Sequence, residues 1–264
     1  MELITSLQNT RIKNIVKLEK ASERKARELF VIEGYREINH AIRAGYLVDS
    51  LFVFPQLADK TSYSNWINST FDAKLFEINK DVFEKIAYRE SSDGLIAIVK
   101  PKKHDLSEIK LSPNPLLLVL ESVEKPGNLG AIMRTADAAA LDAVIVCDSR
   151  CDVYNPNAIR SSIGCVFSTQ IAVCNNEDAH KWLTQNNIST YAASLDAKSA
   201  YHKMNFTKPT AFIMGTEADG LSKFWIEKCN EKVIIPMSGI HDSLNVGTAS
   251  AILAFEAKRQ RDFL

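Results

Sequence analysis

The stretch Pro115–Ala140, PLLLVLESVEKPGNLGAIMRTADAAA, joins an apolar run, a turn with two glycines and an alanine-rich segment. The run Pro115–Val123 predicts a buried strand, and the segment after Gly130 predicts a helix. Many nucleotide-binding folds begin with a strand, a glycine turn and a helix. This stretch differs from a dinucleotide-binding loop because it carries Asn128 and Arg134 where further glycines would stand.

The chain has 264 residues, enough for one large domain or two ordinary ones. Hydrophobic residues make up 46% and charged residues 24%, a balance typical of a globular protein with a substantial core. The net charge is zero, so the protein as a whole does not attract polyanions. The segment Arg11–Arg27 is an exception, because it holds seven basic and two acidic residues, a local charge of +5. This segment is either a solvated helix face or a contact for nucleic acid.

The five cysteines are an odd number without a C-x-x-C pair, and most lie in apolar surroundings. This pattern favours reduced thiols in a cytoplasmic protein. The longest apolar runs have the length of a strand, and the first residues show no signal-peptide pattern. We therefore expect a cytoplasmic protein that does not span a membrane.

The hydrophobic pattern divides the chain into two expected domains and a linker. Residues 1–100 alternate strand-like and helix-like segments, including a helix over SNWINSTF (64–71), as in a small α/β domain. Residues 101–114 are polar, flanked by prolines and without periodicity, which is typical of a linker. Residues 115–264 alternate apolar strands with helices, which predicts a parallel sheet covered on both faces.

Ligands of open parallel sheets bind beyond the carboxyl ends of the strands, so the loops at that edge are the candidate sites. The opening loop, KPGNLGAIMRT, contains only G-x-x-G, which is weak evidence for NAD; a plain tight turn is the alternative. Arg134 lies near the start of the following helix and suits a phosphate or carboxylate. An ion pair with Asp137, three residues further on, explains Arg134 equally well.

Two later loops also follow apolar strands. In AFIMGTEADGLS, Gly215 permits a close approach to the backbone, Glu217 can accept hydrogen bonds or bind a cation, and Ser222 is expected to cap the next helix. In VIIPMSGIHDSLNVGTASA, either Asp242 or Ser243 is expected to cap the last helix.

Other arrangements of reactive side chains are less informative. His241, Asp242 and Ser243 are consecutive, so their side chains point apart and cannot form a hydrolase triad. The remaining histidines are scattered without metal-ligand spacing, and no metal site is expected. Arg160, in NPNAIRSSIG, either contacts a phosphate or ends a solvated helix.

In order and spacing, NLGAIMRTADA, FIMGTEADGLS and IIPMSGIHDSLNVGTASAILAFEA resemble the three motifs of the SpoU (TrmH-type) branch of the SPOUT RNA methyltransferases. The match spans Leu116 to Gln260. The first hundred residues resemble, more weakly, the ribosomal-protein-like RNA-binding domain of that family. Two positions depart from the usual pattern: Thr216, where asparagine is common, and Gly247, where serine is frequent. Neither departure removes a catalytic group.

This resemblance implies an enzyme that transfers a methyl group from S-adenosylmethionine to a ribose 2′-hydroxyl of RNA. It also implies a homodimer whose catalytic α/β domain contains a deep trefoil knot, with the cofactor held by the knot loops. Ribosomal RNA is favoured over transfer RNA because the N-terminal domain resembles a ribosomal protein. The alternatives are a transfer-RNA methyltransferase of the same family, a nicotinamide-dependent oxidoreductase, and a non-catalytic RNA-binding protein that kept the fold.

The resemblance assigns roles to the residues that match the motifs. The implied catalytic residues are Arg134, Asn128, Glu217, Ser243 and Asn245. The implied cofactor contacts are Leu195, Gly215, Ile235, Met237 and Leu244. The expected RNA contacts are Arg11, Lys13, Lys17, Lys20 and Arg160.

The implied reaction needs no metal and no covalent intermediate, because a sulfonium donor is already activated. The enzyme must align the reacting atoms and remove the hydroxyl proton. The family mechanism uses the motif arginine as the proton acceptor, although a guanidinium is almost always protonated. Arg134 therefore either accepts the proton or holds a phosphate or the developing alkoxide.

Overall fold

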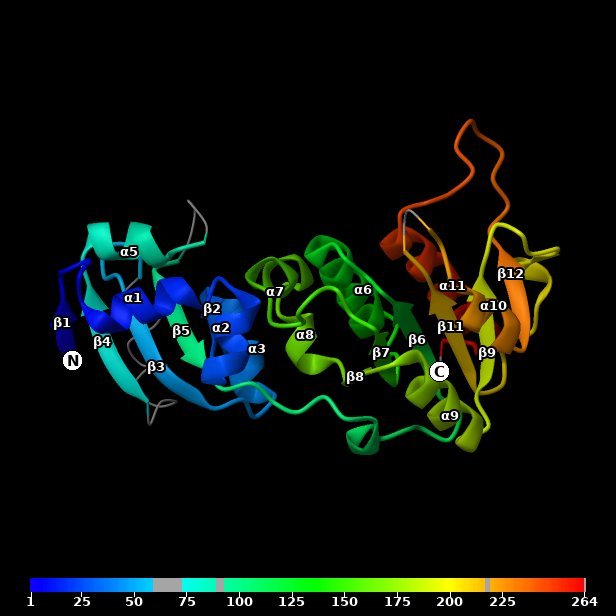
Figure 1. Cartoon of the computed structure of the whole chain (residues 1–264), viewed down its shortest axis with the longest axis horizontal. Helices are drawn as coiled ribbons and strands as arrows, with labels where there is room; N and C mark the ends of the chain where they lie inside the picture. Colours follow the sequence, from blue (N-terminus) through cyan, green and yellow to red (C-terminus); the bar gives the residue numbers. More distant parts are fainter. Residues whose placement is uncertain (59–72, 89–92, 217–218, 264) are drawn as a thin grey trace. The chain divides into compact units, whose positions relative to one another are not determined.

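The computed structural model describes residues 1–58, 73–88, 93–216 and 219–263. The chain forms two compact units (Figure 1). The first unit contains Met1–Lys103 and Tyr154–Phe167, and the second contains His104–Val153 and Ser168–Leu264. The helix expected over residues 64–71 lies outside the described residues.

The first unit is built on a mixed five-stranded sheet in the order β1-β4-β3-β5-β2. Strands β1, β4 and β3 are parallel, and β5 runs antiparallel to both β3 and β2. Its strands are β1 (Glu2–Ile4), β2 (Phe30–Glu33), β3 (Val48–Val53), β4 (Lys74–Ile78) and β5 (Leu95–Val99). Its helices are α1 (Thr10–Lys17), α2 (Ala21–Arg27), α3 (Tyr35–Arg43), α5 (Lys80–Ile86), α7 (Pro156–Ser162) and the start of α8 (Cys165–Ser168).

The basic segment forms two short helices rather than one. Helix α1 buries Ile12 and Ile15 against the core, which turns its basic side chains toward solvent. Arg24 of α2 is only 5% exposed, and its guanidinium donates to the carbonyl oxygens of Leu18 and Glu19, each at 2.8 Å. Arg24 therefore satisfies backbone groups at the end of α1 and is not part of a surface charge.

Residues 154–167 belong to the first unit, although the hydrophobic pattern predicts them in the second domain. The ring of Tyr154 stacks on Phe30 with centroids 4.2 Å apart, and its hydroxyl lies 3.3 Å from that of Tyr46. Phe167 packs against the rings of Phe30 and Tyr46. Aromatic contacts of this kind contribute beyond the area they bury, which accounts for the position of this segment.

The second unit is built on a parallel seven-stranded sheet in the order β10-β12-β9-β11-β6-β7-β8. Its central strands are buried at every position, as the near-continuous apolar runs predict for a sheet covered on both faces. The strands are β6 (Leu116–Glu121), β7 (Ala143–Cys147), β8 (Ile171–Cys174), β9 (Ser189–Ala193), β10 (Ser199–Ala200), β11 (Thr210–Met214) and β12 (Glu231–Ile234).

Helices cover both faces of this sheet. One face packs against α9 and α10, which contribute Leu183 and Trp225 to its core. Helices α6 and α11 lie side by side and cover the other face (Figure 1). The helices of the unit are η1 (Leu106–Glu108), α6 (Pro126–Ala138), α9 (Asn176–Gln185), η2 (Tyr201–Lys203), α10 (Lys223–Lys228) and α11 (Val246–Gln260).

The expected linker is mostly attached to the second unit. Leu106, Ile109 and Leu111 pack against the core of that unit. The Gln170 side chain accepts from the N–H of Lys110 and donates to its carbonyl oxygen, both at 2.9 Å. These contacts hold the segment along the sheet, so only its first residues, up to Lys103, belong to the other unit.

Two cysteines of the second sheet are partners in neighbouring strands. Cys147 ends β7, and its register partner Cys174 ends β8. The hydrogen bond with Cys174, together with burial, raises the pKa of the Cys147 thiol far above its usual range. Cys147 therefore stays protonated.

None of the helices in the described ranges combines the length and apolar composition that crossing a bilayer requires.

Candidate active site

A cavity of about 410 Å³ opens at the carboxyl ends of β9, β11 and β12, a size typical of small-molecule sites. Its lining comes mainly from three segments, at residues 193–196, at 214–216 with 219–221, and at 233–244. All five residues expected to contact a cofactor lie around it: Leu195, Gly215, Ile235, Met237 and Leu244. This is the edge at which an open parallel sheet binds its ligand.

Gly215 lines this cavity and lies very close to the backbone of Gly220. A Cβ atom at Gly215 would lie 2.3 Å from both the carbonyl carbon and the carbonyl oxygen of Gly220. Thr216 and Gly220 exchange two backbone hydrogen bonds, at 3.0 and 3.2 Å, next to this contact. Only glycine fits at position 215 without moving the opposite backbone.

Asn245 caps α11, in place of the expected Asp242 or Ser243. Its Oδ1 accepts from the N–H of Gly247 at 2.9 Å, and its Nδ2 donates to Asn128 Oδ1 at 3.1 Å. The capping prediction was wrong because all three residue types suit a cap, and the contact with Asn128 of α6 is a tertiary one. Ser243 is exposed and lines the cavity instead.

Arg134 does not line the cavity of its own chain. It is exposed on α6, six residues after Asn128, which places it roughly 120° around the helix axis from that residue. The lining of the cavity includes neither residue. The alternative ion pair with Asp137 is not formed, and Asp137 instead accepts from the Ser168 hydroxyl at 2.9 Å.

Glu217 lies outside the described residues, so the structure does not place it. Its described neighbours Thr216 and Asp219 both line the cavity, and Thr216 Oγ1 accepts from the N–H of Asp219 at 3.0 Å.

Four of the expected RNA contacts are exposed at α1: Arg11, Lys13 and Lys17 on the helix, and Lys20 just beyond it. The Arg11 guanidinium lies 4.7 Å from the centroid of the Phe76 ring, a cation–π contact that holds its position. The basic surface is smaller than the sequence predicts. Arg24 is buried, and Arg27 forms an ion pair with Glu23 at 2.8 Å.

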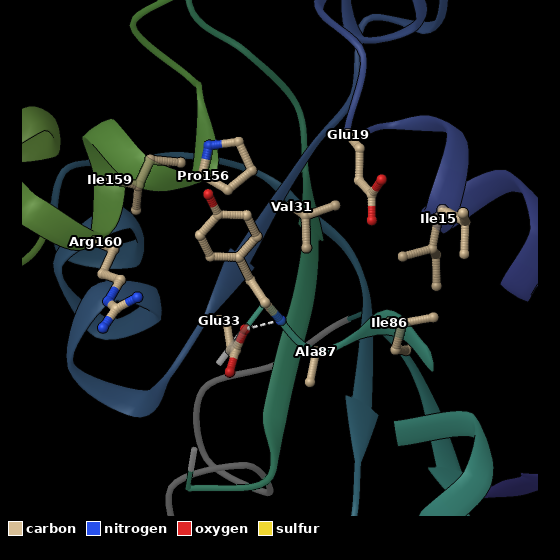
Figure 2. A pocket seen from close by; sticks show the side chains of 11 residues that line it. Ile15, Glu19, Val31, Glu33, Ile86, Ala87, Pro156, Ile159 and Arg160 are labelled. Atoms are coloured by element: carbon tan, nitrogen blue, oxygen red, sulfur yellow. Dashed lines mark hydrogen bonds between the residues drawn. The ribbon is translucent and has the colours of Figure 1, made fainter. Parts of the chain in front are cut away.

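Arg160, the fifth expected RNA contact, is exposed on α7 and lines a mostly apolar pocket of the first unit. Figure 2 shows Ile159 and Arg160 on one side of this pocket and Ile15 on the other. Glu33 lies between them and accepts from the N–H of Tyr88 at 2.6 Å. Arg160 thus belongs to the same unit as the α1 cations and not to the unit that holds the cavity.

Several acidic residues at the ligand edge of the second unit have roles that the sequence did not predict. Asp196 and Asp219 line the cavity, as does Asp242, which was expected only as a helix cap, and Glu121 is buried at the end of β6. Glu121 had a visible signal, because a charged residue ends the apolar run LLLVLE. Within the described residues, no group of three or more His, Cys, Asp or Glu side chains could hold a metal ion.

Comparisons with known proteins find relatives that span nearly the whole chain. The sequence model of the SpoU rRNA Methylase family matches residues 115–255, and that of the MRM3-like substrate binding domain matches residues 9–97. The 23S rRNA (guanosine-2'-O-)-methyltransferase RlmB of Escherichia coli (strain K12) is 32% identical over 250 residues, which cover 92% of this chain and 94% of RlmB. The 23S rRNA (guanosine(2553)-2'-O)-methyltransferase RlmP of Bacillus subtilis (strain 168) is 28% identical over 98% of this chain and 100% of RlmP.

A solved structure matches nearly the whole fold. The SpoU methyltransferase AviRb from Streptomyces viridochromogenes, in complex with AdoMet, aligns with a TM-score of 0.90 and 27% identity over 97% of this chain and 99% of AviRb. The family model covers more than half of this chain, and RlmB exceeds 30% identity over almost all of it. The chain therefore belongs to the SpoU rRNA methylase family.

Proposed function

We propose that this protein transfers a methyl group from S-adenosylmethionine to a ribose 2′-hydroxyl of ribosomal RNA. The observation that carries the proposal is the cavity at the sheet edge, around which Leu195, Gly215, Ile235, Met237 and Leu244 come together. The resemblance to the family and the position of these loops after strands predict all five residues from the sequence. A plain structural turn gives no reason for all five to line one space.

S-adenosylmethionine is the proposed ligand of this cavity. The AviRb structure, which this chain matches in fold, contains AdoMet. The volume of about 410 Å³ suits a nucleoside derivative, and the lining mixes apolar side chains with backbone groups around Gly215. The sulfonium supplies an activated methyl group, so the protein has to align the donor with the hydroxyl and manage one proton.

The proposed catalytic residues come from the three motifs. Asn128 and Asn245 form one hydrogen-bonded pair beside the start of α11, where they can hold the ribose. Ser243 lies on the cavity wall and can bind the target nucleotide. Arg134 stabilises the developing alkoxide or accepts its proton, and Glu217 orients Arg134 or the ribose.

The position of Arg134 supports the proposal of a homodimer. Arg134 is exposed and does not line the cavity of its own chain, and we propose that a second copy presents it to the reacting nucleotide there. Helix α11 packs against α6, and its Phe255 side chain is 39% exposed and therefore accessible to such a copy. The proposed knot has support in the path of α11, which follows the outlying strand β12 yet returns to pack against α6, β11 and β6.

Ribosomal RNA is the proposed substrate, and the first unit is proposed to bind it. RlmB and RlmP are named as 23S rRNA methyltransferases, and residues 9–97 match an MRM3-like substrate binding domain. The exposed cations Arg11, Lys13 and Lys17 supply the charge that tracks phosphates. We propose that the RNA-binding and methyl-transfer domains correspond to the two units, with residues 154–167 in the first, and that the protein acts in the cytoplasm.

The test is methyl transfer from labelled S-adenosylmethionine to ribosomal RNA isolated from a strain that lacks this protein. We expect label at one ribose, located by resistance of the methylated linkage to alkaline cleavage. RNA from the parent strain should accept no label. Label only in transfer RNA would support the alternative substrate within the family. Binding of S-adenosylmethionine without transfer to any RNA would support a non-catalytic RNA-binding protein, and binding of NAD in its place an oxidoreductase.

A further inference from the structure

We infer that Glu121 is a positioning residue for methyl transfer, because its carboxylate fixes the backbone that forms one wall of the S-adenosylmethionine cavity. The identity of this ligand rests on the proposed function. Glu121 is the last residue of β6 and is 4% exposed. The cavity lining does not include Glu121, so it acts through other residues.

The carboxylate of Glu121 accepts three hydrogen bonds from two later elements. Its Oε2 accepts from the backbone N–H of Ser222 at 2.8 Å, and its Oε1 accepts from the Ser222 hydroxyl at 2.6 Å. The amide Nδ2 of Asn176, at the start of α9, donates to Oε1 at 2.6 Å. Ser222 occupies the N-cap position of α10 as expected, but its hydroxyl is directed to Glu121 and makes no cap bond.

The neighbouring donors require a carboxylate at this position. The indole N–H of Trp225 donates to Asn176 Oδ1 at 2.6 Å, and an indole has no acceptor. Asn176 must therefore turn its NH₂ toward Glu121. The backbone N–H of Ser222 can likewise only donate a hydrogen bond. Each oxygen of Glu121 thus faces a group that can only donate. A glutamine at this position would place its NH₂ against one of these donors in either orientation, and that hydrogen bond would be lost.

The position of Ser222 determines that of the cavity wall. Gly220 and Leu221 precede Ser222 and line the cavity. Gly220 is bonded to Thr216 and lies against Gly215 too closely for any side chain. A shift of Ser222 is therefore transmitted to Gly215. Glu121 therefore connects the end of β6 to the cavity wall at Gly220 and Leu221, which the cofactor is proposed to contact.

The test compares the Kd of S-adenosylmethionine, measured by calorimetry, for the wild type, Glu121→Gln, Ser222→Ala and the double variant. We expect Glu121→Gln to weaken binding on the order of tenfold, Ser222→Ala less, and the double variant no more than Glu121→Gln alone. The control is Asp142→Asn. Asp142 accepts from the N–H groups of Ser112 and Leu116 at the opposite end of β6, so its loss should lower the melting temperature and leave Kd unchanged.

Hydrogen exchange of the ligand-free protein provides a readout that does not depend on the cofactor. We expect the amides of Thr216, Gly220 and Ser222 to exchange faster in Glu121→Gln than in Asp142→Asn. Unchanged exchange together with unchanged Kd would overturn the inference, even if Glu121→Gln melts at a lower temperature. If Glu121→Gln does not fold, the exposed Ser222→Ala decides, and an unchanged Kd there would overturn it. A wild type that binds no S-adenosylmethionine refutes the proposed function, while faster exchange in Glu121→Gln still supports the positioning role.

Discussion

The side-chain amide of Asn245 donates to Asn128 Oδ1 at 3.1 Å and so joins two sequence motifs 117 residues apart. The other end of the same amide accepts from the N–H of Gly247 at 2.9 Å and caps α11. One side chain therefore both starts a helix and links that helix to α6. The two roles can be separated, because Asn128 takes part in only one of them.

We expect Asn245→Ala to lower both stability and methyl transfer, and Asn128→Ala to lower mainly transfer. Loss of the cap costs about 1 kcal/mol of unfolding free energy, while the Asn128 variant keeps the cap intact. Chemical denaturation and single-turnover methyl transfer measure the two effects. The activation free energies of the single and double variants are then compared. If the increase in the double variant equals the sum of the two single increases, the two amides act independently.

We expect Gly215→Ala to abolish binding of S-adenosylmethionine. The added methyl group would lie 2.3 Å from the Gly220 backbone and would force the cavity wall apart. Gly127→Ala is the matched control, since no atom apart from its chain neighbours and the backbone of its own helix lies within 4 Å of the added methyl group. Gly127 is the second residue of α6, where alanine forms helix more readily than glycine, so this variant should not lose stability. Calorimetry and thermal unfolding measure the outcomes, and normal cofactor affinity in Gly215→Ala would contradict the role of this contact.

The strands and the ligand edge follow from the sequence because they depend on local patterns. The run LLLVLE is apolar at five consecutive positions and forms the buried β6, and the cofactor candidates lie where strands end. The cap of α11 could not be predicted in the same way. Asp242, Ser243 and Asn245 are all good caps, and the hydrogen bond of Asn245 to Asn128 is not visible in the local sequence.

Contacts between distant residues also decide two other features that the sequence did not reveal. Tyr154 stacks on Phe30 and holds residues 154–167 on the first unit, although the intervening chain contains the strands β6 and β7 and the helix α6 of the second. Arg24 looks like its basic neighbours in the sequence, yet it is buried and bonded to backbone carbonyls. Charge counts cannot distinguish such a residue from an exposed one.

We expect the triple reversal Lys13→Glu, Lys17→Glu and Lys20→Glu to weaken RNA binding and to reduce its dependence on salt. Each phosphate that the variant no longer neutralises lowers the slope of log Kd against log salt by roughly 0.7–0.9. Filter binding at several salt concentrations measures this slope. Reversing three exposed lysines of the second unit changes the net charge equally and serves as the control: Lys181, Lys203 and Lys208. Equal effects of the two triple variants would show that α1 does not bind the RNA.

We expect Arg24→Ala to reduce stability without changing the salt slope. Its guanidinium is buried and donates to the carbonyl oxygens of Leu18 and Glu19, so its removal leaves two acceptors without this donor. The cost should be about 1–3 kcal/mol of unfolding free energy. Denaturation and the same filter-binding series measure both quantities. A lower salt slope at unchanged stability would instead place Arg24 at the RNA surface.

We expect Arg134→Ala to abolish methyl transfer and to leave the Kd of S-adenosylmethionine unchanged, because Arg134 does not line the cavity of its own chain. If a second copy supplies the arginine, two inactive proteins should complement each other. Arg134→Ala keeps an intact cavity, and Gly215→Ala keeps an intact Arg134. Random mixing makes half of the dimers mixed, with one complete site in each, so activity should recover to roughly a quarter of the wild-type value. Unfolding and refolding the two variants together, followed by single-turnover transfer, measures this recovery. Arg134 would act within its own chain if the mixture stayed inactive although native mass spectrometry detected the mixed dimer.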